Sequence, residues 1–188
     1  NALMDSFFER VTNEFEKVEY LVHSIAFAKR EHLQGKYYEV NKRGFEVAEE
    51  VSAYSLVEIS RRTLRIMNKN ASIIALTYLG SEKVVPNYNI MGIAKASLEG
   101  VIRYLAYDLG ELNIRVNGIS AGPIPTLAAT AIKDFYDMLL NFTSKAPLKR
   151  TITAEEVADT ALFLLSELSS GITGQVIYVD AGYSVMGV

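Results

Sequence analysis

Three side chains, Tyr78, Tyr88 and Lys95, carry the strongest chemical signal in this sequence. Tyr88 and Lys95 are seven positions apart, so in a helix they lie about two turns apart on one face. An ammonium beside a phenol stabilises the phenolate, and it can donate up to three hydrogen bonds to sugar hydroxyls. The pair therefore indicates acid chemistry next to a ribose. Because tyrosine and lysine at helical spacing often only pack, the surrounding elements must decide.

Helical and strand patterns alternate along the chain, which is typical of an α/β fold with βα units around a parallel sheet. In such open sheets ligands bind just beyond the carboxyl ends of the strands. The segment 18–27 is apolar almost throughout, as expected for a strand buried on both faces. The predicted strands are 18–27, 71–76, 114–120 and 175–179, and the predicted helices are 3–15, 43–67, 88–109, 126–140 and 154–166.

Several residues predict where these helices begin and end. Residues 68–70 (Asn-Lys-Asn) are a stop signal for the long second helix, and Gly110 is a plausible C-terminal cap for the helix that carries Lys95. Thr153 with Glu156 three residues later has the pattern of a capping box.

The composition favours one soluble domain over residues 1–188, because 188 residues with 49% hydrophobic content can bury a sizeable core. A net charge of -3 disfavours nucleic-acid binding. The absence of cysteine excludes disulfides and suits the cytoplasm, and two histidines are too few for a histidine metal site. No segment has the length of a membrane span or the layout of a secretory signal.

Four segments converge on one family. Residues 22–28 (Val-His-Ser-Ile-Ala-Phe-Ala) and 76–80 (Leu-Thr-Tyr-Leu-Gly) end strands, residues 87–96 open the helix with Tyr88 and Lys95, and residues 115–128 contain Ser-Ala-Gly-Pro-Ile. Together they closely resemble the bacterial NADH-dependent enoyl-[acyl-carrier-protein] reductases, a branch of the short-chain dehydrogenase/reductase superfamily. The resemblance runs essentially from end to end.

This resemblance implies a Rossmann-like doubly wound sheet, and reduction of trans-2-enoyl thioesters on acyl carrier protein by NADH in fatty acid elongation. It implies a homotetramer as well. Tyr88 would donate to the thioester oxygen, Lys95 would hold the nicotinamide ribose, and Tyr78 would line the thioester site. The other implied cofactor residues are Ser24, Ile25, Gly122, Pro123, Ile124, Thr126, Leu127 and Ala128, and the other implied substrate residues are Ala28, Met91, Ile132, Phe135 and Met138.

Two alternative functions stay open. Ketone and alcohol oxidoreductases of the superfamily usually carry a serine thirteen residues before the catalytic tyrosine, and here that position is Ala75. This argues against a β-ketoacyl reductase or another short-chain dehydrogenase, and Tyr78 supplies a second phenol as in the enoyl reductases. The other alternative is a catalytically silent subunit that only assembles with its own copies.

The family's first βα elements, with their glycine-rich turn, have no counterpart before Asn1. We therefore expect a Rossmann-like sheet that lacks these elements, in a chain that is either a fragment of a normal reductase or a natural short form. In both cases segment 18–27 would become an exposed apolar edge.

Overall fold

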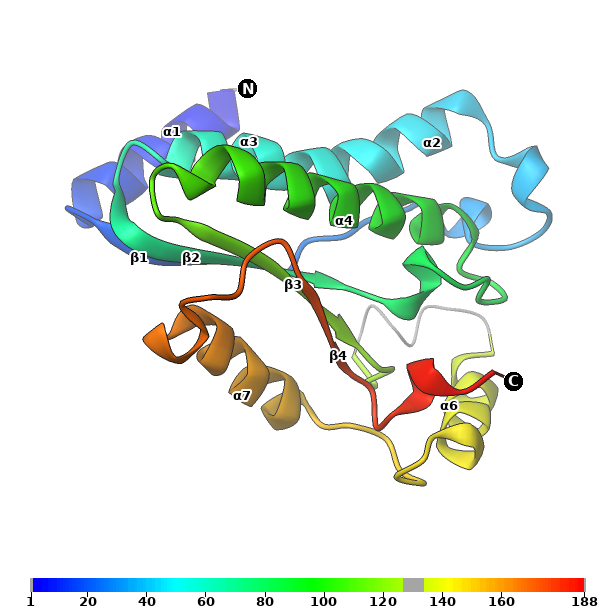
Figure 1. Cartoon of the computed structure of the whole chain (residues 1–188). Helices are drawn as coiled ribbons and strands as arrows, with labels where there is room; N and C mark the ends of the chain where they lie inside the picture. The colour runs from blue at the N-terminus through cyan, green and yellow to red at the C-terminus, as the bar shows by residue number, and fades with distance from the viewer. Residues whose placement is uncertain (1, 127–133, 188) are drawn as a thin grey trace.

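The computed structural model describes residues 2–126 and 134–187, which form a parallel sheet with helices on both faces (Figure 1). All four strands run parallel in the order β1-β2-β3-β4. The strands are β1 (Val18–His23), β2 (Met67–Thr77), β3 (Arg115–Ala121) and β4 (Val176–Val179). The helices are α1 (Ala2–Glu14), α2 (Lys42–Glu49), α3 (Ser55–Thr63), α4 (Asn89–Gly110), α6 (Phe135–Lys145) and α7 (Ala154–Leu165), with a π-helix at Glu50–Tyr54 between α2 and α3. The α/β fold is thus confirmed.

Alternation along β2 divides the core into two layers. Ile73 is fully buried and packs with Leu98 and Ile102 of α4, whereas its neighbour Ile74 packs with Leu164 of α7. Figure 1 shows α2, α3 and α4 covering one face of the sheet and α7 the other. A parallel sheet covered on both faces is what continuous apolar strands produce.

Close packing fixes the long helix α4 over the sheet. A Cβ atom on Gly118 of β3 would lie 2.9 Å from Cδ1 of Ile102, closer than side chains tolerate. The glycine therefore lets α4 approach the strand, and this approach sets the height of every α4 side chain above the sheet.

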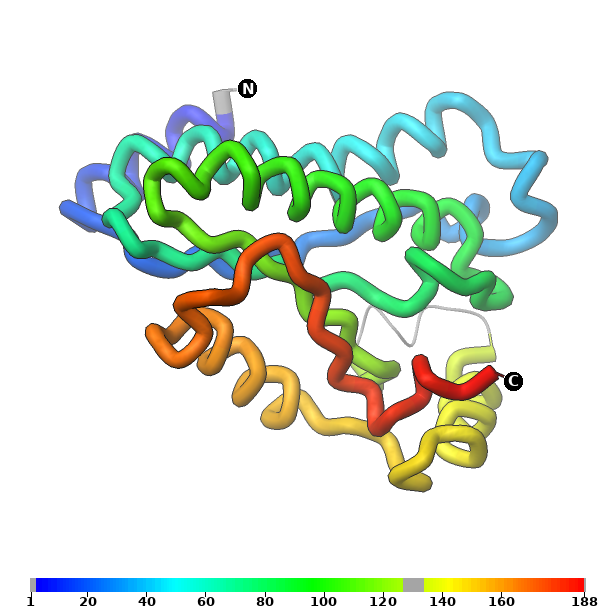
Figure 2. Tube along the Cα trace, in the orientation of Figure 1, coloured from blue at the N-terminus to red at the C-terminus, as the bar shows by residue number. Residues whose placement is uncertain are grey.

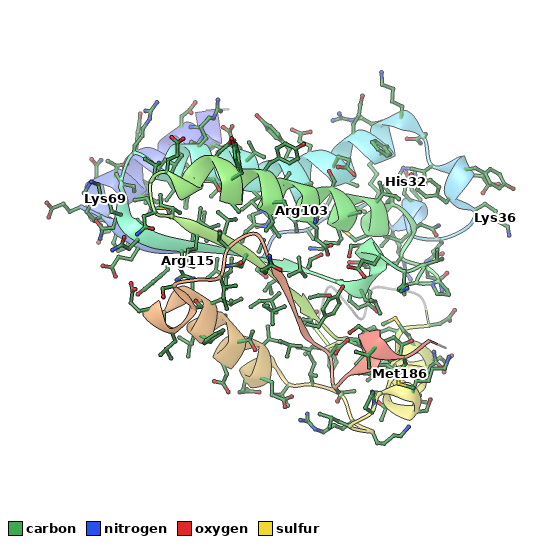
Figure 3. All side chains as sticks on the ribbon, viewed as in Figure 1. His32, Lys36, Lys69, Arg103, Arg115 and Met186 are labelled. Carbon is green, nitrogen blue, oxygen red and sulfur yellow. The ribbon has the colours of Figure 1, made fainter. Side chains whose placement is uncertain are left out.

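Helix α7 is fixed at both ends. The Thr153 hydroxyl accepts from the Glu156 amide and the Glu156 carboxylate accepts from the Thr153 amide, so the predicted capping box is confirmed. At the other end Arg115 of β3 donates to the carbonyl oxygens of Leu164 and Ser166 at 2.7 and 3.0 Å. Figure 3 labels Arg115 between the sheet and this helix. A cation at the C-terminus of a helix is favourable.

Strand β1 is shorter than predicted. The sequence predicts a strand over 18–27, but the strand ends at His23. Beyond it, the Ser52 hydroxyl contacts both the amide and the carbonyl of Phe27, at 3.0 and 3.3 Å. Because Ser52 lies in the π-helix, this helix binds the extended segment after β1 in place of a neighbouring strand.

The edge position of β1 agrees with the expectation of an exposed apolar strand. Tyr20 and Val22 are each 52% exposed, so β1 is not buried on both faces. Within the described residues β1 has a strand neighbour, β2, on one side alone.

Three other boundaries differ from the prediction. Residues 68–70 lie inside β2, which begins at Met67, and α3 ends earlier, at Thr63; Asn70 has φ 67°. Gly110 is the last residue of α4 and not its cap, and the chain turns at Asn113 with φ 57°. Helix α6 begins at Phe135 and extends to Lys145, beyond the predicted end at residue 140. In Figure 2 the segment after β4 lies beside α6. There the rings of Phe142 and Tyr183 stack, with centroids 4.6 Å apart.

Candidate active site

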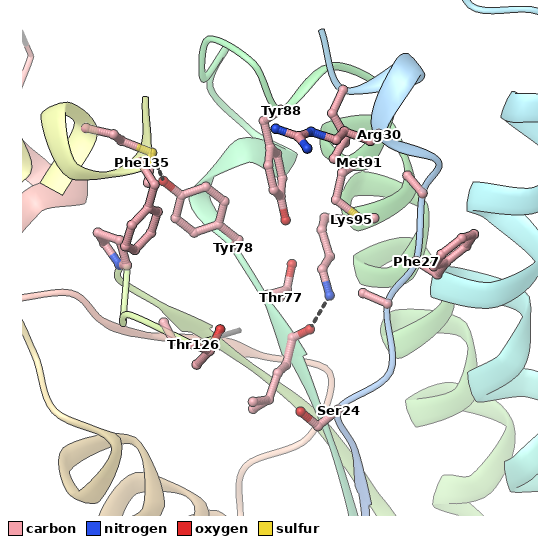
Figure 4. A pocket seen from close by; sticks show the side chains of 17 residues that line it. Ser24, Phe27, Arg30, Thr77, Tyr78, Tyr88, Met91, Lys95, Thr126 and Phe135 are labelled. Carbon is pink, nitrogen blue, oxygen red and sulfur yellow. Dashed lines mark hydrogen bonds between the residues drawn. The ribbon is translucent and has the colours of Figure 1, made fainter. Parts of the chain in front are cut away.

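A cavity of about 520 Å³ lies at the carboxyl ends of β1, β2 and β3. This is the edge of the sheet where the strand pattern predicts a ligand site. Figure 4 shows Tyr78, Tyr88 and Lys95 around it. The cavity is lined by Ser24, Ala26, Phe27, Ala28, Arg30, Leu33, Leu76, Thr77, Tyr78, Tyr88, Met91, Lys95, Ala121, Pro123, Thr126, Phe135 and Met138.

Two glycines give Tyr88 its place. Tyr88 is the N-cap of α4, immediately before the first helical residue, Asn89. A Cβ atom on Gly80 would lie 2.5 Å from Cδ1 of Tyr88, and one on Gly92 would lie 2.7 Å from the Gly80 carbonyl oxygen. Both positions must therefore be without a side chain for the Tyr88 ring to fit against the loop after β2.

The two phenols pack against each other. The rings of Tyr78 and Tyr88 meet edge to face, with centroids 5.0 Å apart. The Tyr78 hydroxyl lies 3.9 Å from the Met138 sulfur, which links the residue after β2 to α6. Aromatic pairs of this geometry hold one another in place, so Tyr78 buttresses Tyr88 in addition to lining the site.

Both phenols stay protonated at neutral pH. Burial raises the pKa of Tyr78 to about 12, with a smaller effect from Tyr183. Burial, and then Tyr78, raise the pKa of Tyr88 far above its ordinary value. Loss of hydration therefore outweighs the stabilisation that a nearby ammonium gives to a phenolate. Tyr88 is a neutral hydrogen-bond donor.

Lys95 comes from α4 and points into the same cavity as the Tyr88 hydroxyl (Figure 4). Its amine donates to the Leu76 carbonyl oxygen at 2.7 Å. That bond uses one of the three donors of an ammonium. Burial lowers the pKa of Lys95 to about 8, and nearby Glu99 opposes this decrease. The lysine is therefore an ammonium at neutral pH.

The residues present fit the ribose and nicotinamide half of a nicotinamide cofactor. Lys95 has two further donors, and no described residue accepts a hydrogen bond from the Tyr88 hydroxyl. Both groups face a cavity of drug-sized volume with mostly apolar walls, the usual form of a cofactor site. Within the described ranges, no group of three acidic, histidine or cysteine side chains could hold a metal ion.

Most of the predicted site residues meet at this cavity. The predicted residues that line it are Ser24, Ala28, Tyr78, Tyr88, Met91, Lys95, Pro123, Thr126, Phe135 and Met138.

Three predicted cofactor residues lie apart from its lining. Ile25 is 44% exposed, and Ile124 packs against the core under α7. Gly122 lines a small adjoining pocket, where Phe142 leaves no room for a Cβ atom. The predictions for Leu127, Ala128 and Ile132 fall outside the described residues.

Sequence reasoning missed several lining residues. Arg30 and Leu33 follow the segment after β1 and line the cavity. In the sequence, only their closeness to Ala28 could have indicated this position. Thr77 is the residue before Tyr78, and its hydroxyl donates to the buried Glu99 carboxylate at 2.6 Å. Glu99 is four residues after Lys95, a spacing that puts both on one face of α4.

Comparison with known proteins identifies the family. The sequence profile of the enoyl-(acyl carrier protein) reductase family matches residues 1–184. The chain belongs to this family. The enoyl-[acyl-carrier-protein] reductase [NADH] FabI of Synechocystis is 52% identical over 187 residues, which are 100% of this chain and 72% of that protein. The protein of the same name from Rickettsia prowazekii is 49% identical, over 98% of this chain and 70% of its own length.

Solved structures agree with the family on fold. The Bacillus cereus enoyl-acyl carrier protein reductase, in a complex with NADP+ and indole naphthyridinone, matches with a TM-score of 0.95 and 48% identity, over 97% of this chain and 71% of that one. The reductase from Anaplasma phagocytophilum, in complex with NAD, matches with a TM-score of 0.93 and 41% identity, over 98% and 70%. The Rossmann-like assignment is thus confirmed, on a chain that spans about seven-tenths of these reductases.

Proposed function

We propose that this chain is an NADH-dependent enoyl-[acyl-carrier-protein] reductase, which converts trans-2-enoyl thioesters to saturated acyl thioesters in fatty acid elongation. The observation that carries the proposal is the shared cavity of Tyr78, Tyr88 and Lys95 at the carboxyl edge of the family's sheet. The relatives named above carry the same activity in their names.

Bound NADH supplies a hydride to the β-carbon of the enoyl thioester. The chain's own residues fix where this happens: the Lys95 ammonium holds ribose hydroxyls with the donors that Leu76 leaves free. Pro123 and Thr126, which follow β3, line the same cavity as Lys95. We assign to the cofactor Ser24, Ile25, Lys95, Gly122, Pro123, Ile124, Thr126, Leu127 and Ala128.

Tyr88 stabilises the charge that develops on the thioester oxygen. With hydride added at the β-carbon the thioester becomes an enolate, and a neutral phenol with a raised pKa keeps its proton to donate a hydrogen bond to the enolate oxygen. A proton taken from water at the α-carbon then completes the saturated thioester. A donor set in advance toward developing charge lowers the barrier by about 3 to 4 kcal/mol. Tyr78 orients the thioester and holds the Tyr88 ring.

Apolar side chains beyond the two tyrosines take the acyl chain. Met91 of α4 lies beside Tyr88, and Phe135 and Met138 of α6 face Tyr78. We assign Ala28, Tyr78, Met91, Ile132, Phe135 and Met138 to the substrate.

The chain lacks the hydroxyl that a ketone reductase of this superfamily uses. Ala75 is fully buried and packs in the core under α4. We therefore expect NADH oxidation with crotonyl thioester of acyl carrier protein, and little or none with acetoacetyl thioester. Faster reduction of the acetoacetyl substrate would contradict the proposal. Intact oligomers that bind no NADH in calorimetry would instead indicate a silent assembly subunit.

The assembly we propose is a homotetramer formed through the outer faces of α3 and α4. Tyr104 and Tyr107 on α4 are 77% and 83% exposed, an unusual exposure for aromatic residues on a helix. No described helix is long and apolar enough to cross a bilayer. The cytoplasmic location that the lack of cysteine favours stays a prediction.

A further inference from the structure

A row of polar side chains lies under α4 at the carboxyl end of the sheet. Thr77 of β2 pairs in register with Ser120 of β3, which pairs with Tyr178 of β4. Thr77 and Ser120 are 4% and 1% exposed, so the row is shielded from water. Glu99 of α4 lies against this row and accepts the Thr77 hydroxyl at 2.6 Å.

Glu99 and Lys95 are both buried, at 6% and 7% exposure. They are four residues apart in α4, so their side chains project from the same face of the helix. A buried charge is tolerated in proteins when an opposite charge or several hydrogen bonds compensate for it. The two groups do not touch directly: the Lys95 amine donates to the Leu76 carbonyl and the Glu99 carboxylate accepts from Thr77, so Glu99 acts on Lys95 through space along one face of α4.

Among the residues that the structure describes, the other groups named around Lys95 carry no negative charge, and the Arg30 guanidinium lines the same cavity. Tyr88, at the start of α4, is a neutral phenol. His23, at the end of β1, has its pKa lowered to about 4 by burial and then by Lys95, so it is neutral at pH 7. Glu99 is the only described group that raises the pKa of Lys95. Glu82 and Asp180 act on Tyr178 at the far end of the polar row and not on Lys95.

We infer that Glu99 is a positioning residue: held by Thr77, it is the counterion that keeps Lys95 an ammonium in the water-poor floor of the active site. The effect on turnover rests on the proposed function, because only a charged Lys95 donates to ribose hydroxyls with its full set of protons. The charge state of Lys95 itself does not depend on the reaction.

The first experiment measures that charge state in protein without NADH or substrate. Competitive acetylation with acetic anhydride at a series of pH values, read by peptide mass spectrometry, gives the midpoint at which the Lys95 amine becomes reactive. We expect a midpoint near pH 8 in the unchanged protein. Glu99→Gln should lower it by about one pH unit, because the amide keeps the acceptor for Thr77 but removes the charge.

Two further variants make the result decisive. Thr77→Val removes the donor that holds Glu99 and should lower the midpoint by a smaller amount, and it decides the question if Glu99→Gln fails to fold. Glu111→Gln removes an exposed charge at the end of the same helix and should leave the midpoint in place. The inference is overturned if the Lys95 midpoint is unchanged in Glu99→Gln. If only Thr77→Val folds, an unchanged midpoint in that variant overturns it.

The second experiment follows kcat/KM for NADH against pH. The decrease of kcat/KM at alkaline pH should move to lower pH in Glu99→Gln. It should stay in place in Glu99→Asp, which keeps the charge. Lower activity of Glu99→Gln without this shift would mean a merely structural role and would reject the counterion. A protein without reductase activity in which Glu99→Gln still shifts the acetylation midpoint would reject the proposed function and leave this inference standing.

Discussion

The protonation of Tyr88 decides what this site does at the residue scale. A phenol whose pKa is raised by burial cannot act as a base, and its proton is available as a hydrogen bond to an oxygen that gains charge. Lys95, with a pKa near 8, is the cation of the pair. In the proposed function the two residues divide the work: Tyr88 stabilises the reacting oxygen and Lys95 positions the cofactor.

Replacing Tyr88 by Phe tests this division. The ring still packs against Tyr78, so we expect the dissociation constant for NADH to change less than about twofold, while kcat falls about 10²-fold to 10³-fold. Stopped-flow turnover and calorimetry measure the two quantities. Tyr37→Phe, at a 45% exposed tyrosine, is the matched control. A similar loss of kcat in that control would remove the special role of Tyr88.

His23 predicts a pH dependence of stability. Its Nε2 atom lies 2.8 Å from the Ser55 hydroxyl, which itself donates to the Val51 carbonyl oxygen, so the imidazole is the donor. The pKa of His23 is about 4 in the folded protein and about 6.5 when unfolded, so the unfolded chain binds more protons between these values. The stability that neutral His23 provides is complete above pH 6.5 and is lost as the pH falls toward 4.

We expect this loss to amount to about 2 kcal/mol of unfolding free energy at pH 5 relative to pH 8. Denaturant titrations of the unchanged protein and of His23→Gln at both pH values measure it, because glutamine keeps a donor for Ser55 but does not titrate. Equal pH dependence in the two proteins would show that His23 is not the group responsible.

At the scale of elements, α7 depends on its cap. Thr153→Ala removes the acceptor for the Glu156 amide, and we expect the free energy of unfolding to fall by about 1 kcal/mol. Thr153→Ser keeps the acceptor and should lose much less. Chemical denaturation compares the three proteins, and equal losses for alanine and serine would assign the effect to the methyl group and not to the cap.

Local patterns predicted much of the fold, and long-range contacts account for the errors. The capping box at Thr153 and the apolar spacing of α4 depend on neighbouring residues, so the sequence shows them. The end of β1 at His23 depends on Ser52, which lies 25 positions from Phe27 and reaches it only in the folded chain. Residues 68–70 looked like a helix stop, but they lie in β2, where Met67 before them and Ser72 after them pair with β1 across a shift in register.

The same distinction holds for the site. Tyr78, Tyr88 and Lys95 were found because their spacing and the family resemblance are visible in the sequence. Glu99 was missed because its proposed role depends on its burial and on its contact with Thr77. No local sequence pattern shows that a carboxylate is buried. Arg30 was missed because the path of the loop after β1 brings it to the cavity.

At the scale of the whole molecule, exposed apolar surface predicts association. Besides Tyr104 and Tyr107 on α4, β1 leaves Tyr20 and Val22 half exposed at the sheet edge. In general a self-complementary helical face can close an assembly at a defined size, whereas an exposed strand edge can pair with another strand.

Sedimentation velocity distinguishes the two kinds of association. We expect a tetramer, and we expect the double variant Tyr104→Glu with Tyr107→Glu to sediment as a smaller species, because like charges would meet across the interface. Val84→Glu, at a side chain 97% exposed on the loop after β2, should remain tetrameric. A tetramer that survives the double variant would place the interface elsewhere.

The π-helix at Glu50–Tyr54 sets a limit on changes in chain length. Each helical residue turns the chain by about 100°, so deleting one position between α2 and α3 would rotate one helix relative to the other by that angle. Ser52 would then no longer face Phe27, and the wall of the cavity formed by residues 24–28 would lose its attachment. Surface loops usually accept insertions and deletions, but this π-helix, in which Ser52 and Ala53 are buried, ties the spacing of two outer helices to the shape of the active site.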